Sequence, residues 1–264
     1  MLARETSHTI RNVKVRLFTA GSGPPLLFLH GAGGIEQWLP FFDLLSARHT
    51  VMVPEHPGFG ASDNPAFIRN VGDVAMYYLD FLDDLAGSSG REKIHLIGHS
   101  LGGWIAAELA IRNCTHLKSL ALLAPAGIRV KGFPSGDNFI WSPEEAARNL
   151  VYDRAYAELA ITAAETAGKA EADRALVNRY AAAKLAWEPR WFDPALERWL
   201  HRIKVPTLVL WGAEDKLLPP CYAEVWRREV PAAVVEIIPA CGHLMHVEKA
   251  ELVANRVLAF TNTA

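Results

Sequence analysis

The sequence predicts an α/β fold: a mostly parallel, doubly wound sheet interrupted by an inserted helical segment. Short apolar runs alternate with stretches of helical periodicity, which is typical of chains that build parallel sheets. This alternation stops after Gly127 and returns at Val205. The 264 residues, half of them hydrophobic, suffice for one large domain with an insertion.

Six apolar runs predict the main strands. Continuous apolar runs of this kind are typical of parallel strands that are buried on both faces. The alternation of apolar and polar residues over 8–19 predicts one or two further strands before them. The six runs cover residues 26–29, 50–53, 93–97, 119–124, 205–210 and 234–238.

Helices are predicted between these runs. Over residues 73–86, apolar side chains recur at helical spacing, so one face can pack on the sheet. Further core helices are predicted from about Trp38 to Leu45, over residues 101–112 and over residues 248–260.

The interrupting segment contains helix signals and no convincing strand. Ser142 before Pro143 has the pattern of an N-cap followed by proline at the first helical position. The alanine-rich residues 153–186 predict further helices. We therefore predict a core of residues 1–127 and 204–264, with residues 128–203 forming a helical cap.

Composition argues against several functional classes. The net charge is −2 and no Lys/Arg run stands out, so neither nucleic acid nor a membrane surface is expected as a partner. No apolar run reaches about 18 residues, and the first residues lack the apolar segment of a secretion signal. The three cysteines are widely spaced and fit reduced thiols. We expect a cytoplasmic protein without metal or organic cofactor, acting on a small molecule, with a homodimer as a possible assembly.

The segment IHLIGHSLGGW contains the pattern G-x-S-x-G around Ser100. An apolar strand enters the pattern and a helix leaves it, as a nucleophile elbow requires. Such a turn lifts the serine hydroxyl above the sheet edge, at the positive end of the following helix. The alternative interpretation is a glycine-rich turn in some other α/β fold, because the bare pattern also arises by chance.

A serine nucleophile needs a base, and the chain has ten histidines. His243 follows the last predicted strand, in a loop that can reach over the carboxyl ends of the strands, where open parallel sheets place their sites. His246 is the rival, although we expect it to begin the last helix or pack beside it. His99 neighbours the serine, but the elbow is expected to point it away from Ser100.

The base needs a carboxylate to orient it. Asp215 lies just beyond the penultimate predicted strand. Its neighbour Glu214 is expected to be a solvated loop carboxylate, and no acid follows Ala124-Pro125, the other plausible location. The resulting order of serine, aspartate and histidine is the one expected of a nucleophile elbow fold.

Acyl transfer also needs hydrogen-bond donors for a developing oxyanion. The amide of Leu101, directly after the serine, is one candidate. A second is expected from residues 30–34, HGAGG, because a glycine-rich loop at a strand end leaves amides free.

Five motifs carry a resemblance to the α/β-hydrolase superfamily along nearly the whole chain: HGAGG, EHPGFGASD, GHSLGG, WGAEDKLLP and ACGHLMHVE. The resemblance implies that residues 128–203 cap the site. It also implies Ser100 as nucleophile, His243 as base, Asp215 as its partner, and the amides of Ala32 and Leu101 as the oxyanion hole.

Differences between this chain and individual families of the superfamily reduce the number of activities to consider. Epoxide hydrolases and haloalkane dehalogenases carry aspartate at the position of Ser100, so neither is expected. Meta-cleavage-product hydrolases usually have tryptophan where this chain has Leu244, and often asparagine in place of His99. Cofactor-free haloperoxidases share the triad. We favour a carboxylic-ester hydrolase, with a C–C bond hydrolase or a ligand-binding receptor with little turnover as alternatives.

Apolar side chains are expected to shape the substrate pocket, which points to a small to medium, mostly apolar ester. Leu217 and Leu244 have the best claim because they adjoin triad members, and Trp38 is a further candidate. Ordinary packing between cap and sheet is at least an equal alternative for every one of these candidates, and for the further apolar candidates Phe139, Trp141, Trp187 and Trp191.

Overall fold

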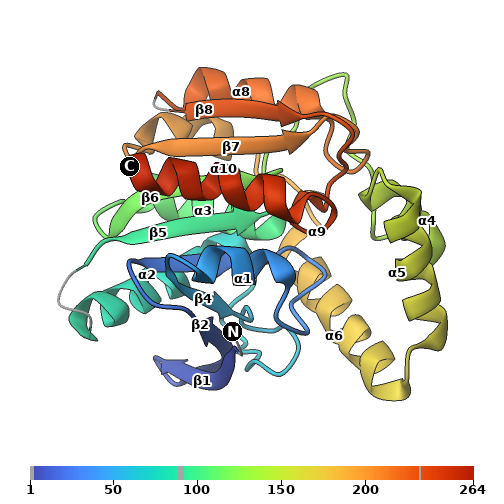
Figure 1. Ribbon diagram of the computed structural model, residues 1–264, viewed down its shortest axis with the longest axis horizontal. Coiled ribbons are helices and arrows are strands. Elements are labelled where there is room, and N and C mark those ends of the chain that lie inside the picture. The colour runs from blue at the N-terminus through green and yellow to red at the C-terminus, as the bar shows by residue number, and fades with distance from the viewer. Residues whose placement is uncertain (1–2, 89–91, 232) are drawn as a thin grey trace.

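A computed structural model describes residues 3–88, 92–231 and 233–264. Figure 1 shows one twisted sheet between two layers of helices, with further helices set to one side. The described strands form an eight-stranded sheet in the order β1-β2-β4-β3-β5-β6-β7-β8. They are β1 (Arg4–Ile10), β2 (Val13–Ala20), β3 (Pro25–Leu29), β4 (Thr50–Pro54), β5 (Ile94–His99), β6 (Leu117–Leu123), β7 (Thr207–Gly212) and β8 (Ala233–Ile238).

All neighbouring strands from β4 to β8 pair in parallel, so the predicted mostly parallel sheet is confirmed. The alternating segment near the N-terminus forms two strands, and β2 pairs antiparallel with both β1 and β4. Arg11 and Asn12 join the β1–β2 hairpin with φ of 50° and 61°. Positive φ at both positions suits the tight two-residue turn that matches strand twist.

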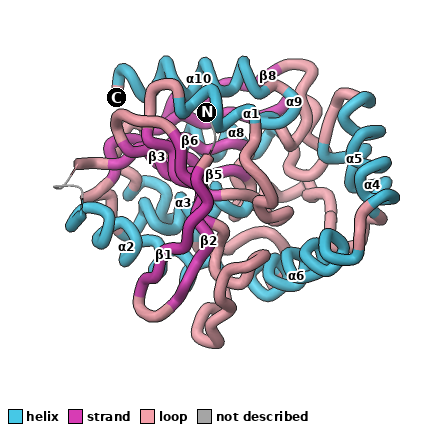
Figure 2. The backbone as a smooth tube through the Cα atoms, turned by 60° about the horizontal axis from the view of Figure 1, so that its bottom comes forward, coloured by secondary structure: helices cyan, strands magenta, loops and turns pink. Residues whose placement is uncertain are grey.

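Helices cover both faces of the sheet, as expected. In Figures 1 and 2, α1 (Pro40–Ser46) and α10 (Ala250–Thr263) lie on one face. The other face carries α2 (Val71–Ser88), α3 (Leu101–Arg112) and α8 (Ala223–Glu229). Two shorter helices, η2 (Pro220–Tyr222) and α9 (Met245–Glu248), follow β7 and β8.

The helix predicted from Trp38 begins two residues later, at Pro40. Leu39 is extended, with φ −96° and ψ 152°. A proline disfavours the helical region for the residue before it, but its own fixed φ suits the first helical position. Pro40 therefore sets the start of α1 and leaves Trp38 in the preceding loop.

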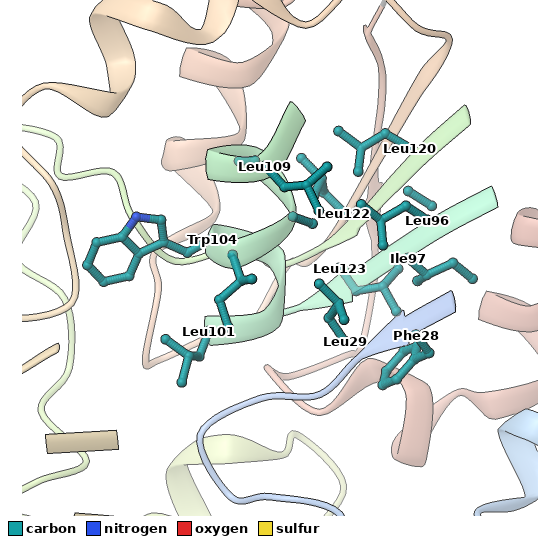
Figure 3. Packing of buried hydrophobic residues seen from close by; sticks show 14 of the residues in the cluster. Phe28, Leu29, Leu96, Ile97, Leu101, Trp104, Leu109, Leu120, Leu122 and Leu123 are labelled. Carbon is teal, nitrogen blue, oxygen red and sulfur yellow. The ribbon is translucent and has the colours of Figure 1, made fainter. Parts of the chain in front are cut away.

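Helix α3 is almost entirely buried in the core. Figure 3 shows buried apolar side chains of α3 together with those of β3, β5 and β6. Helix and sheet approach so closely that a Cβ on Gly102 would lie 2.0 Å from the carbonyl oxygen of Leu29. Glycine at this position is therefore required by contact with the β3 backbone.

Residues 128–203, which we call the cap, run between β6 and β7. They contain α4 (Pro143–Leu150), α5 (Arg154–Thr166), α6 (Lys169–Ala186), α7 (Leu196–Trp199) and η1 (Leu200–Arg202). Ser142 caps α4 as predicted, since its hydroxyl accepts the Glu145 amide and the Glu145 carboxylate accepts the Ser142 amide. In Figure 1, α4 and α5 lie together while α6 runs apart from them. Across the described ranges, no helix combines the length and apolarity needed to span a membrane.

Candidate active site

Ser100 occupies the predicted turn between β5 and α3. Its φ of 53° and ψ of −116° are strained for a residue with a side chain. Backbone bonds hold the strain: the Ser100 amide donates to Leu123, and the Ser100 carbonyl accepts from Trp104 and Ala126, all at 3.0 Å. The turn therefore fixes the hydroxyl at the carboxyl edge of the sheet.

Asp215 and His243 form a buried pair. His243 Nδ1 lies 2.7 Å from Asp215 Oδ2 and donates to it. The other oxygen, Oδ1, accepts the amides of Leu217 at 2.9 Å and Leu218 at 2.8 Å, which fixes the carboxylate. With the proton on Nδ1, Nε2 is the basic nitrogen of the ring. Nε2 is buried and has no hydrogen-bond partner among the residues that the structure describes.

Two neutral histidines adjoin His243. His99 Nε2 donates to the His243 carbonyl at 3.0 Å, so His99 supports the histidine loop. This bond directs the His99 ring at the histidine loop, and the ring lies in the wall of the cavity that Ser100 also lines. His246 lies in the short helix α9 before the last helix, 4.3 Å from the His99 ring. Burial lowers the pKa of His99 well below 6.5 and that of His246 to about 3.

Glu214 is not the solvated carboxylate that was expected. Its Oε2 accepts the amide of Cys241 at 2.8 Å, and the side chain is half-buried. The two neighbouring carboxylates therefore both bind the loop that carries His243: Asp215 binds the imidazole of His243, and Glu214 binds the backbone amide of Cys241.

The glycine-rich loop of residues 30–34 lies over Ser100. A Cβ on Gly31 would lie 3.4 Å from the Ser100 Cβ. His30 anchors the loop, because its Nε2 accepts the His56 amide at 2.9 Å and its Nδ1 donates to the Gly31 carbonyl at 2.7 Å. Burial lowers the pKa of His30 to about 4, which keeps this single tautomer neutral. The Leu101 amide, the first of α3, has no intrahelical acceptor.

A cavity of about 320 Å³ opens beside these groups. Ser100 and His243 line it, together with the predicted Leu217 and Leu244. Other described residues on its walls include Ala32, Phe139, Leu150, Arg179 and Trp191.

Trp38 is not among the cavity residues, so its assignment to the pocket is wrong. Its indole donates to Asp43 at 3.0 Å and its ring packs 5.2 Å from that of Phe42. Trp141 and Trp187 are also absent from the lining, and Arg190 stacks 4.0 Å above the Trp187 ring.

Two buried polar side chains join the cap to the site: Glu248 ends the motif ACGHLMHVE but was given no role from the sequence, and Asn178 lies in no motif. Asn178 on α6 contacts Gly33 and Gly60, and Glu248 on α9 accepts the amides of Tyr152 and Gly242, both at 2.8 Å. The only local signal for Asn178 is a polar residue on the helical face that also carries Ala181, Ala182 and Leu185.

Within residues 3–88, 92–231 and 233–264, no group of three His, Cys, Asp or Glu side chains is placed to hold a metal ion. The three cysteines are free thiols.

Known proteins share this architecture. Residues 24–250 match the family described as alpha/beta hydrolase fold. The chain is 30% identical to a 2-hydroxymuconate semialdehyde hydrolase of Pseudomonas sp. strain CF600, over 93% of this chain and 89% of that protein. It is 27% identical to the dihydrolipoyllysine-residue acetyltransferase component of the acetoin cleaving system of Cupriavidus necator, covering 91% of this chain but only 64% of that protein.

Among solved structures, the chain is similar to a bacterial membrane phospholipase A described as a virulence factor. The TM-score is 0.79 at 29% identity, over 99% of this chain and 86% of that one. The family match spans most of the chain and includes the elbow and the histidine loop. The chain therefore belongs to the alpha/beta hydrolase fold family and is a serine hydrolase of that family.

Proposed function

We propose that this hydrolase cleaves carboxylic esters of small to medium, mostly apolar substrates through an acyl-enzyme. One observation carries the proposal: a buried Asp215–His243 pair and a strained Ser100 meet at the wall of one largely apolar cavity. Similarity to a phospholipase A, a name that denotes ester cleavage, supports it.

The mechanism follows from the roles of these groups. His243 Nε2 takes the hydroxyl proton of Ser100 as the Ser100 oxygen attacks the acyl carbonyl. Asp215 accepts a hydrogen bond from Nδ1 throughout, which keeps the proton on that nitrogen. The amides of Ala32 and Leu101 stabilise the oxyanion. His243 then protonates the leaving alcohol, and water activated by the same histidine releases the acid.

The cavity supports an apolar substrate of limited size. Leu217 and Leu244 adjoin the Asp215 and His243 positions, and Phe139 and Trp191 enter from the cap. Walls whose exposed surface is mostly aromatic and aliphatic favour apolar acyl or alcohol groups.

Hydrolysis of p-nitrophenyl acetate, butyrate and octanoate by the wild type and by Ser100→Ala tests the proposal. We expect multiple turnovers in the wild type and a loss of several orders of magnitude in the variant. The chain-length profile then measures the acyl pocket. A wild type that binds these esters without turnover favours the receptor alternative, and a fully active variant excludes Ser100 as nucleophile.

C–C bond hydrolysis is the second candidate, and Arg179 favours it. This cation lines the cavity from α6, where it can pair with a substrate carboxylate, and several relatives are named as hydrolases of 2-hydroxy-6-oxo-dienoates. The discriminating assay follows the loss of absorbance of such a dienoate. If this is the natural chemistry, Arg179→Leu slows dienoate cleavage at least ten-fold more than cleavage of p-nitrophenyl butyrate.

A further inference from the structure

Asn178 uses both ends of its amide, although it is only 2% exposed. Nδ2 donates to the Gly33 carbonyl at 2.9 Å, and Oδ1 accepts the Gly60 amide at 2.9 Å. A carbonyl only accepts and a backbone amide only donates, so the two partners fix the orientation of the side chain. Helix α6 of the cap is thereby bonded to the loop of residues 30–34.

The contact is close and local. A Cβ on Gly34, whose φ is +82°, would lie 2.3 Å from Asn178 Nδ2. In contrast, a Cβ on Gly33 would meet nothing within 4 Å. No described side chain therefore packs where a Cβ of Gly33 would lie, and the hydrogen bond from Asn178 is what holds this residue to α6.

The bond reaches the oxyanion site through two peptide units that a hydrogen bond connects. Asn178 holds the carbonyl of the Gly33–Gly34 peptide, and the amide of the same peptide donates from Gly34 to the Gly31 carbonyl at 3.1 Å. That carbonyl belongs to the Gly31–Ala32 peptide. In a trans peptide the N–H points opposite to the C=O, so fixing the Gly31 carbonyl also fixes the direction of the Ala32 amide.

We propose that Asn178 is a positioning residue that, together with the His30 Nδ1 bond to the same Gly31 carbonyl, sets the direction of the Ala32 amide in the oxyanion hole. The inference rests on the proposed function, because Ala32 is the second oxyanion donor there. Hydrogen bonds in such a chain also polarise one another, so the Asn178 amide strengthens Ala32 as a donor. Through this series of hydrogen bonds, the position of α6 on the core affects how strongly the oxyanion hole binds an oxyanion.

The test uses Asn178→Leu and Asn178→Asp, with Asn64→Ala as a matched control. Leucine removes both contacts. Aspartate keeps an acceptor for the Gly60 amide but, when ionised at pH 8.5, places an oxygen against the Gly33 carbonyl. The control removes a different bond between α6 and the core, from Lys184 Nζ to Asn64 Oδ1 at 2.8 Å.

With p-nitrophenyl butyrate at pH 8.5, both Asn178 variants are expected to lose about 10- to 100-fold in kcat, with KM within two-fold. The control is expected to stay within two-fold in both. Affinity for butylboronic acid, which forms a tetrahedral adduct on a nucleophilic serine, should fall in parallel with kcat. Affinity for the product butyrate should not change.

Wild-type kcat in Asn178→Asp overturns the proposal, as does an equal loss in the Asn64→Ala control. Equal weakening of boronic acid and butyrate binding also overturns it, because that pattern indicates a purely structural role. If Asn178→Leu does not fold, the aspartate variant decides. If the wild type turns over no ester, the proposed function fails, and boronic acid binding by wild type and variants still tests the position of the amide.

Discussion

Helix α3 of the core and helix α5 of the cap have similar lengths, 12 and 13 residues, but are stabilised differently. Eleven residues of α3 are buried, whereas Ala157 is the buried residue of α5. Helix α5 relies on local contacts, including an N-cap bond from the Ala155 amide to Asp153 and an ion pair between Arg148 and Glu158. Exposed pairs of this kind contribute at most about 1 kcal/mol.

The difference between the two helices shows that the core and the cap hold the catalytic groups by different interactions. Close packing around α3 fixes the nucleophile, since the elbow begins that helix. The cap is joined to the histidine loop and the glycine-rich loop by individual buried hydrogen bonds, from Glu248 and Asn178. Changes in the exposed half of the cap are therefore expected to leave the catalytic groups in place.

The largest difference is expected between a core glycine and a cap glycine. Gly102→Ala places a methyl group 2.0 Å from a backbone oxygen of β3, so we expect a loss of more than about 4 kcal/mol, or no folded protein. Gly168→Ala, at the N-cap of α6, meets a flexible Glu171 carboxylate at 2.9 Å and should cost less than about 1 kcal/mol. Urea unfolding measures both, and similar values would contradict the comparison.

Two leucines test packing directly. Leu109→Ala empties a fully buried position on α3 and is expected to cost about 2–5 kcal/mol. Leu159→Ala on α5, where the side chain is 67% exposed, should change stability by less than about 0.5 kcal/mol. Chemical denaturation of both variants provides the measurement, and a large loss for Leu159→Ala would show packing that the structure lacks.

Acid should destabilise the core through its buried histidines. Burial lowers the pKa of His30 to about 4 and that of His246 to about 3, whereas the unfolded chain titrates near 6.5. Below pH 6.5 the unfolded state binds more protons, so stability falls by up to about 1.4 kcal/mol per pH unit for each group, until pH reaches the folded pKa. Urea midpoints at pH 7, 6 and 5 should decrease, and less so in His246→Gln. A midpoint unchanged down to pH 5 would argue against these neutral histidines.

Glu248→Gln tests the bond between cap and histidine loop. The carboxylate accepts three backbone amides, from Tyr152, Asp153 and Gly242, and glutamine replaces one acceptor oxygen by a donor. We expect a loss of about 1–3 kcal/mol in stability and a several-fold loss in kcat, because the His243 loop loses a support. Glu251→Gln, an exposed substitution on α10, is the control and should behave as wild type. Unaltered stability and kcat in Glu248→Gln would show that Glu248 does not support the His243 loop.

The sequence by itself determined the sheet, the elbow and the chain order of Ser100, Asp215 and His243. These features are local: apolar runs predict buried strands, a glycine-flanked serine between strand and helix predicts the elbow, and loops after parallel strands meet at one edge. The pair of His243 and Asp215 then follows from two neighbouring strand ends.

Tertiary structure decided the rest. Trp38 was misassigned because its indole bonds Asp43 and packs on Phe42 of α1, and Glu214 because its backbone partner, the Cys241 amide, lies 27 residues away. The bonds from Asn178 to the Gly33 carbonyl and from the Tyr152 amide to Glu248 span 145 and 96 residues. No local pattern predicts them, because their energies depend on how two separately folded segments are placed against each other.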